Sequence, residues 1–126
     1  RRAAIEGVAL NLRWAMSKVV REKGAQTTGP VSIVGGVASD PVFAQTLADA
    51  LNRDIRVCSA RHAGMLGTAT LAAPMMGWAN SVCDAAATLK SRTSATYAPN
   101  PIRVAQLAAR AERLAKIRRL AIRSYS

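Results

Sequence analysis

Two adjacent glycines, followed by the start of a helix, are the residues of this sequence best placed to do chemistry. Gly35-Gly36 directly follows a short β-branched run at residues 31–34, and Ser39, Asp40 and Pro41 come next. Glycines let a ligand approach the backbone closely, and the free N–H groups of a helix start favour an anion. The pattern favours a turn that binds an anionic ligand, but a tight strand-to-helix turn without a ligand explains it equally well.

Other motifs for chemistry are absent. The glycine pair has neither the third glycine of GxGxxG nor the Gly-Lys-Ser/Thr of a phosphate loop. Cys58 and Cys83 stand 25 positions apart in no CxxC arrangement and with one His in the chain, so we expect free thiols in a reducing compartment and no metal site. No residue of the chain is predicted to be catalytic.

Short strands alternating with helices position the glycine turn, which predicts an α/β fold. Apolar residues with a helical period predict a helix over residues 3–23, with Gly24 as its stop. Residues 31–34 are predicted to form a buried strand and residues 55–58 a second one. Between them we expect a helix that Ser39 or Asp40 caps, with Pro41 in its first turn and Asn52 at its end.

The second half of the chain is predicted to contain three helices and a loop. Residues 63–73 are small and apolar, which indicates a tightly packed helix that Pro74 ends. A short helix over residues 78–90 and a loop over residues 93–101 follow. The last helix, residues 102–123, is amphipathic: Val104, Leu107, Ala111, Leu114, Ala115 and Ile122 line one side, and Arg110, Arg113, Lys116, Arg119 and Arg123 the other.

The charge is large but unevenly distributed. The 126 residues carry 18 Lys+Arg against 7 Asp+Glu, a formal charge of +11, yet residues 90–126 hold nine of the basic side chains and only one acid. With 50% hydrophobic residues the chain can bury the core of one domain, and no apolar run is long enough to span a membrane. A small basic nucleic-acid-binding protein stays open as an alternative, but few aromatics and no recognition signature make nucleic acid an unfavoured partner.

Residues 31–57 (VSIVGGVASDPVFAQTLADALNRDIRV) resemble the C-terminal domain of the FGGY carbohydrate kinases, most closely the xylulose-kinase-like branch. The family's strand, Gly-Gly-Gly-Ala-x-Ser turn, Leu-Ala-Asp-x-Leu-Gly-Arg helix and following strand all have counterparts here. Residues 2–13, 63–73 and 97–101 resemble the family's preceding helix, its Ala-Gly-Ala-Leu-Gly-Ala-Ala helix and its Tyr/Phe-x-Pro-x-Pro segment. The resemblance covers essentially the whole chain.

The resemblance implies an actin-like (ribonuclease H-like) ATPase fold, with residues 1–126 as its C-terminal, nucleotide-binding domain. Gly35, Gly36 and Val37 would shape the nucleotide turn, with Gly36 near the ribose and α-phosphate. Asp40 would lie near the adenine, or would only cap the helix. Val37 stands where many members have a third glycine, Asp40 where Ser or Asn is usual, and His62 where Glu is common; we assign His62 no role.

The resemblance also implies what the full enzyme does. With ATP and Mg²⁺ it would phosphorylate a sugar hydroxyl, most simply that of a ketopentose such as xylulose. The family's catalytic aspartate, sugar-binding residues and first phosphate loop precede the matched region, so we expect the chain to be a fragment that is inactive alone. Its expected partners are ATP, a small sugar, an N-terminal domain and a second copy in a homodimer, in the cytoplasm. A non-sugar actin-like ATPase domain and a regulatory or degraded fragment remain alternatives.

Overall fold

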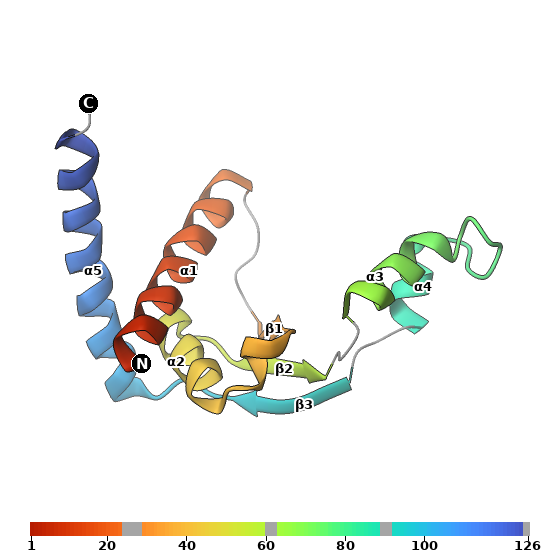
Figure 1. The fold of residues 1–126 in the computed structure, drawn as a ribbon, viewed down its shortest axis with the longest axis horizontal. Coiled ribbons are helices and arrows are strands. Elements are labelled where there is room, and N and C mark those ends of the chain that lie inside the picture. Colours follow the sequence, from red (N-terminus) through yellow and green to blue (C-terminus); the bar gives the residue numbers. More distant parts are fainter. Residues whose placement is uncertain (24–28, 60–62, 89–91, 125–126) are drawn as a thin grey trace.

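The computed structural model describes residues 1–23, 29–59, 63–88 and 92–124, and it is a mixed α/β fold (Figure 1). The elements in chain order are helix α1 (Arg2–Lys23), strand β1 (Val31–Ile33), 3-10 turn η1 (Gly36–Ser39), helix α2 (Pro41–Leu51), strand β2 (Ile55–Ser59), helices α3 (Ala63–Ala72) and α4 (Val82–Thr88), strand β3 (Arg92–Tyr97) and helix α5 (Pro101–Ser124). The predicted helix over residues 3–23 is confirmed; Gly24 and His62 lie outside the described residues.

The three strands form one sheet in the order β1-β2-β3. Strand β1 runs parallel to β2, with Val31 opposite Ile55, and β3 runs antiparallel to β2, with Tyr97 opposite the same Ile55. The prediction of a loop over residues 93–101 was therefore wrong, because its first half pairs with the free edge of β2. That pairing joins segments far apart in sequence, and tertiary context of this kind overrides local propensity.

Helix α2 lies between the sheet and the two longest helices. Leu47 of α2, Ile55 of β2, Leu10 of α1 and Leu107 of α5 belong to one buried cluster, which joins all four elements. The expectation of a fully buried first strand was wrong: Ser32 of β1 is exposed and its neighbours are half-buried, because described helices pack on only one face of the strand.

Local signals fix both ends of α2. The Asp40 carboxylate caps the helix by accepting a hydrogen bond from the Val42 N–H at 2.9 Å, and Pro41 occupies the first turn. Asn52 ends the helix in the left-handed conformation, with φ 52° and ψ 46°. The predicted start and end are both confirmed, and Asp40, not Ser39, is the cap.

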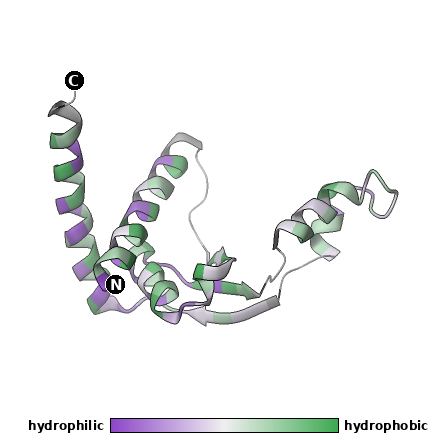
Figure 2. Cartoon of the chain, in the orientation of Figure 1, coloured by the Kyte–Doolittle hydropathy of each residue, from purple (hydrophilic) through white to green (hydrophobic). Residues whose placement is uncertain are grey.

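Helix α5 is amphipathic as predicted. Leu107 is buried, and Val104, Ala111, Leu114 and Ala115 are half-buried, whereas Arg110, Arg113, Lys116 and Arg119 are exposed. The side chains of Ile122 and Arg123 lie outside the described residues. The C-terminal half of α5 extends past the other helices, as Figures 1 and 2 show, and leaves Ile117 and Leu120 exposed.

Helices α3 and α4 form a hairpin beyond the ends of β2 and β3 (Figure 1). The expectation that residues 63–73 pack tightly was wrong, since Met65 and Leu71 of α3 are mostly exposed. The predicted helix over residues 78–90 begins only at Val82, because the Ser81 hydroxyl accepts from the Asp84 N–H and acts as its N-cap.

The described residues contain no helix that is long and apolar enough to cross a membrane. They also hold no group of three or more His, Cys, Asp or Glu side chains that could bind a metal ion. Cys58 and Cys83 are free thiols.

Candidate functional site

The glycine turn joins the end of β1 to the start of α2. Gly35 adopts φ 108° and ψ 178°, a combination that is essentially restricted to glycine. Its carbonyl then accepts from the Ala38 N–H at 3.1 Å, and the Val37 carbonyl accepts from the Asp40 N–H at 3.2 Å. Backbone geometry alone therefore explains the first glycine, as the structural interpretation of the pair expected.

Gly36 has a different environment. Its φ is not in the left-handed region, and a Cβ built on it would meet no atom within 4 Å. Neither the backbone conformation nor the packing of the described chain requires glycine here. Within the described residues, no hydrogen bond uses the Gly36 N–H or the Val37 N–H. These amides at the entrance to α2 are free to bind an anion.

The rest of the turn is held by one small buried side chain. Ala38 is 5% exposed and packs with Ala44 of α2 and Val57 of β2. Val37, one position earlier, is 63% exposed. The side chain that replaces a third glycine therefore lies at the surface and adds an apolar group beside the free amides.

The Asp40 carboxylate already has two partners. One oxygen caps α2, and the other lies 2.8 Å from an Arg1 guanidinium nitrogen at the start of α1. The Val42 N–H and then Arg1 lower the pKa of Asp40 below its ordinary value of 3.8. Asp40 is therefore ionised near neutral pH, and Arg1 offsets its charge close to the turn.

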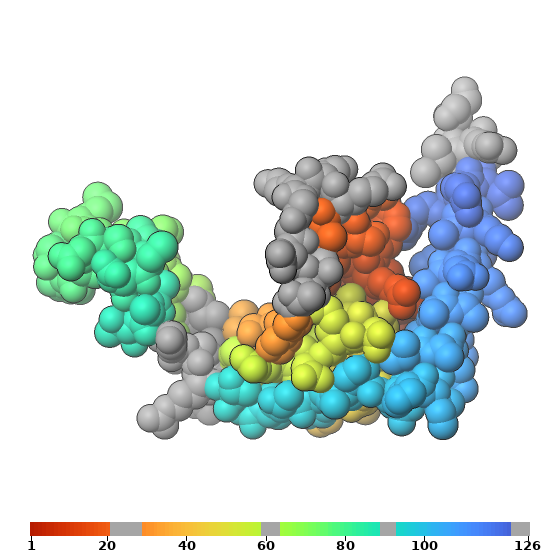
Figure 3. Space-filling model, turned by 180° about the vertical axis from the view of Figure 1, so that it is seen from behind, coloured from red at the N-terminus to blue at the C-terminus, as the bar shows by residue number. Residues whose placement is uncertain are grey.

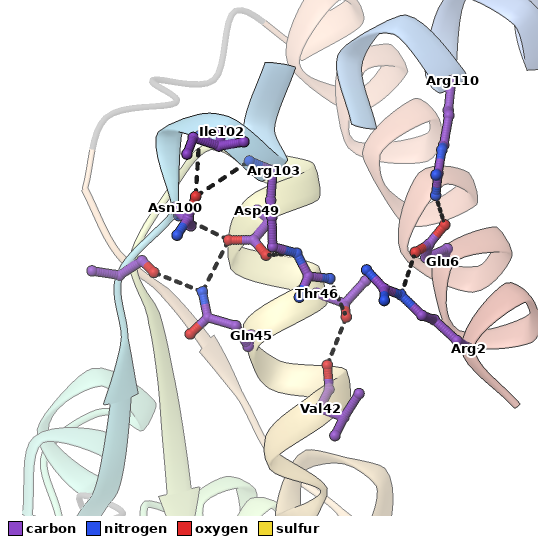
Figure 4. Close-up of polar contacts among 11 residues, drawn as sticks. Arg2, Glu6, Val42, Gln45, Thr46, Asp49, Asn100, Ile102, Arg103 and Arg110 are labelled. Carbon is purple, nitrogen blue, oxygen red and sulfur yellow. Dashed lines mark hydrogen bonds and ion pairs between the residues drawn. The ribbon is translucent and has the colours of Figure 1, made fainter. Parts of the chain in front are cut away.

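A buried carboxylate fixes the C-terminal half of α2 (Figure 4). Asp49 is fully buried, and its Oδ1 accepts from the Gln45 amide at 2.9 Å and from the Asn100 N–H at 2.8 Å. Its Oδ2 lies 2.9 Å from Arg103 Nε but accepts no well-aligned hydrogen bond, so this contact is an ion pair. Gln45 also donates to the Ala98 carbonyl. The network attaches the segment between β3 and α5 to the helix that begins at the glycine turn.

A second partly buried acid connects the two long helices. Glu6 of α1 pairs with Arg2 at 3.1 Å and with Arg110 of α5. Burial raises the pKa of Glu6, but the hydrogen bonds and charges of Arg2 and Arg110 outweigh burial and hold it below its ordinary value of 4.5. Both acids with a lowered pKa are thus paired with arginines.

The structure keeps Gly35, Gly36, Val37 and Asp40 on one exposed turn, as their sequence spacing requires. Two hollows lie elsewhere, one of about 250 Å³ between α1 and α5 and one of about 450 Å³ between α1 and the end of α2, and neither includes the turn. Sequence reasoning missed Arg1 as the partner of Asp40, and no local signal marks it. It also missed Asp49, although an acid between Ala48 and Ala50 on the apolar side of a helix was a usable signal.

Residues 1–76 match the model of the FGGY family of carbohydrate kinases, C-terminal domain. The match includes the glycine turn and ends after α3. The Tyr97–Pro101 segment lies outside the match, so its resemblance is tested only by the structural comparison.

Solved kinases share the fold. The ligand-bound xylulose kinase from Lactobacillus acidophilus is 24% identical with a TM-score of 0.81, over 98% of this chain and 24% of that one. The gluconate kinase from the same organism is 22% identical with a TM-score of 0.79, over 94% and 23%. Plasmodium falciparum glycerol kinase with ADP is 20% identical with a TM-score of 0.71, over 91% and 23%. The chain spans about a quarter of the length of these kinases.

Proposed function

The chain belongs to the FGGY family of carbohydrate kinases, and from this we propose that residues 1–126 form the ATP-binding C-terminal domain of a longer sugar kinase. In the proposed enzyme, ATP lies in a cleft between this domain and an N-terminal domain. The turn of Gly35, Gly36 and Val37 contacts the nucleotide from this side.

Gly36 is the single observation that carries the proposal. The described chain gives no reason for glycine at this position, whereas a nucleotide lying against the backbone would exclude a side chain. The free N–H groups of Gly36 and Val37 face the same place, at the start of a helix, where an α-phosphate oxygen is stabilised. The ADP in the structure of the glycerol kinase with the same fold supports a nucleotide as the ligand.

Asp40 has a supporting role in this proposal. Its carboxylate is already used in the cap and in the ion pair with Arg1, so we assign it to the position of the turn and not to adenine. An ionised carboxylate beside a phosphate is repulsive, and Arg1 reduces that repulsion. Arg1 is therefore expected to help the turn tolerate an anionic ligand.

Phosphoryl transfer needs more than this surface. The reaction depends on positioning both substrates and on stabilising the charge of the transferred group, and Mg²⁺ bridging phosphate oxygens supplies much of that stabilisation. The turn does not fit a resident metal site: Asp40 is engaged, and the described residues contain no group of potential metal ligands. The base, the metal ligands and the sugar site are assigned to the N-terminal domain. A ketopentose such as xylulose is the proposed sugar, with gluconate and glycerol as the substrates to compare.

Isothermal titration of the chain with a non-hydrolysable ATP analogue tests the proposal. We expect saturable binding that Gly36→Val abolishes, because the new side chain occupies the space of the nucleotide. Gly7→Val is the matched control: a Cβ at Gly7 also meets nothing within 4 Å, but Gly7 lies on α1, far along the chain from the turn. Binding that is absent in the wild type, or equal in the wild type and Gly36→Val, would contradict the proposal.

A further inference from the structure

The α3–α4 hairpin, residues 63–88, has almost no core of its own. Helix α3 has 10 residues and α4 has 7, lengths at which isolated helices are marginal in water. The buried apolar residues of the hairpin are two small ones, Ala73 and Ala85, and neither belongs to the two core clusters of the described chain. The hairpin therefore lacks the packing that normally stabilises helices of this length.

The surface of the hairpin is strongly apolar. Its exposed large hydrophobic residues are Met65 (70% exposed), Leu71 (64%), Met75 (89%), Met76 (60%), Trp78 (77%) and Val82 (43%). Apolar residues occur all around α3, a pattern typical of a helix that is buried on every side. With roughly 200 Å² as the full area of a large apolar residue, these six leave on the order of 800 Å² exposed, the area that each partner buries in a standard interface.

The hairpin is also separated from the positive charge of the chain. All 18 Lys and Arg residues lie outside residues 63–88, and Asp84 is the one charged residue within them. Figures 1 and 3 show the hairpin standing apart from the body formed by the other described residues, seen from opposite sides. In Figure 2 it is mostly green and white, whereas purple is concentrated on α1 and α5.

We propose that the hairpin is a self-association surface that packs against the hairpin of a second copy of this chain. A two-fold contact presents the same six large apolar side chains from both copies and brings together four short helices that lack a core separately. The charge distribution favours a second copy as the occupant, because a contact through the hairpins buries no cation and keeps two strongly positive bodies apart.

The methionines suit such a contact. Met65, Met75 and Met76 are unbranched and flexible, so they can fill irregular gaps between facing helices. Gly64 and Gly67 have open space above their backbone, which allows a helix of the partner to approach α3 closely. This proposal rests on the hairpin alone and does not depend on nucleotide binding.

Sedimentation velocity of the whole chain, from about 1 to about 200 µM, tests the proposal. We expect a reversible monomer–dimer equilibrium, with a species of twice the 13.3 kDa chain mass. Met75→Glu and Trp78→Glu place charges at the two most exposed hairpin positions and should each weaken dimerisation at least tenfold. Ile102→Glu is the matched control, because Ile102 is 72% exposed but lies on α5, and it should leave the dimer unchanged.

Salt provides a second readout. Raising NaCl from about 0.05 to about 0.5 M should strengthen the dimer, because salt screens the repulsion between the bodies and does not weaken apolar packing. Circular dichroism of each variant verifies that the monomer remains folded. A monomer over the whole concentration range would overturn the proposal and assign the hairpin to another polypeptide segment. Association that Met75→Glu and Trp78→Glu leave intact, or a series of ever larger species, would also overturn it.

Discussion

Arg103 Nε lies 2.9 Å from Oδ2 of the fully buried Asp49, and this ion pair ties the first turn of α5 to the C-terminal half of α2. The same carboxylate accepts the Asn100 N–H through its other oxygen. One acid thus holds the entry to the last helix against the helix that begins at the glycine turn.

Removing this carboxylate should destabilise the whole body. Asp49→Ala leaves Arg103, the Asn100 N–H and Gln45 without their partner, and we expect the free energy of unfolding to fall by about 3 kcal/mol. Urea unfolding followed by circular dichroism measures the change. Glu112→Ala, at an exposed position of α5, is the control and should stay within about 0.5 kcal/mol of the wild type. A loss below that margin in Asp49→Ala would show that the network is unimportant.

The two glycines of the turn should respond differently to alanine. Gly35→Ala places a side chain at φ 108° and should lower the free energy of unfolding by about 1–3 kcal/mol. Gly36→Ala has room for its Cβ and should change stability by less than about 0.5 kcal/mol. Thermal and urea unfolding of both variants provide the comparison. Equal losses would mean that Gly36 also has a structural role within the chain.

The Glu6 ion pairs should make stability depend on acid pH. Because the pKa of Glu6 is lower in the folded state, its contribution is present above 4.5 and is lost as the pH falls through the lower folded value. In Glu6→Gln this part of the acid sensitivity should disappear. Urea titrations between pH 6 and about pH 3 compare the two proteins. Parallel pH profiles would contradict the assignment.

The chain alone should not phosphorylate sugars. A coupled assay with ATP and xylulose, gluconate or glycerol should detect no sugar-dependent ADP production, because the proposed domain supplies one side of the nucleotide site and no base. The ligand titration proposed above serves as the control that the protein is active in binding. Sugar-dependent turnover by purified wild type that follows the chain through purification would refute this prediction.

Local chemistry explains which elements could be predicted from the sequence. The Asp40 cap, Pro41 and Asn52 define α2 by short-range interactions, so both of its ends were predicted correctly. The amphipathic period of residues 102–123 likewise predicted α5 and its packed side. Strand β3 depends on pairing with β2, which no local signal within residues 93–97 indicates.

The composition of α3 indicated that it needs burial but could not say against which surface. In the described chain no such surface covers it, so the predicted packing failed. At the site, adjacent residues made the turn predictable. The partners of Asp40 and Asp49, Arg1 and Arg103, come from distant segments that only the tertiary fold brings together.

The most direct test of nucleotide binding at the turn is a ¹⁵N-labelled NMR titration of the chain with an ATP analogue. The account predicts saturable shifts of the Gly36 and Val37 amides and of the first residues of α2, with one dissociation constant for all of them and little change at Gly7 or Met75. Saturable shifts that leave Gly36 and Val37 unmoved, or that follow the basic residues of α5 and vanish with salt, would contradict it.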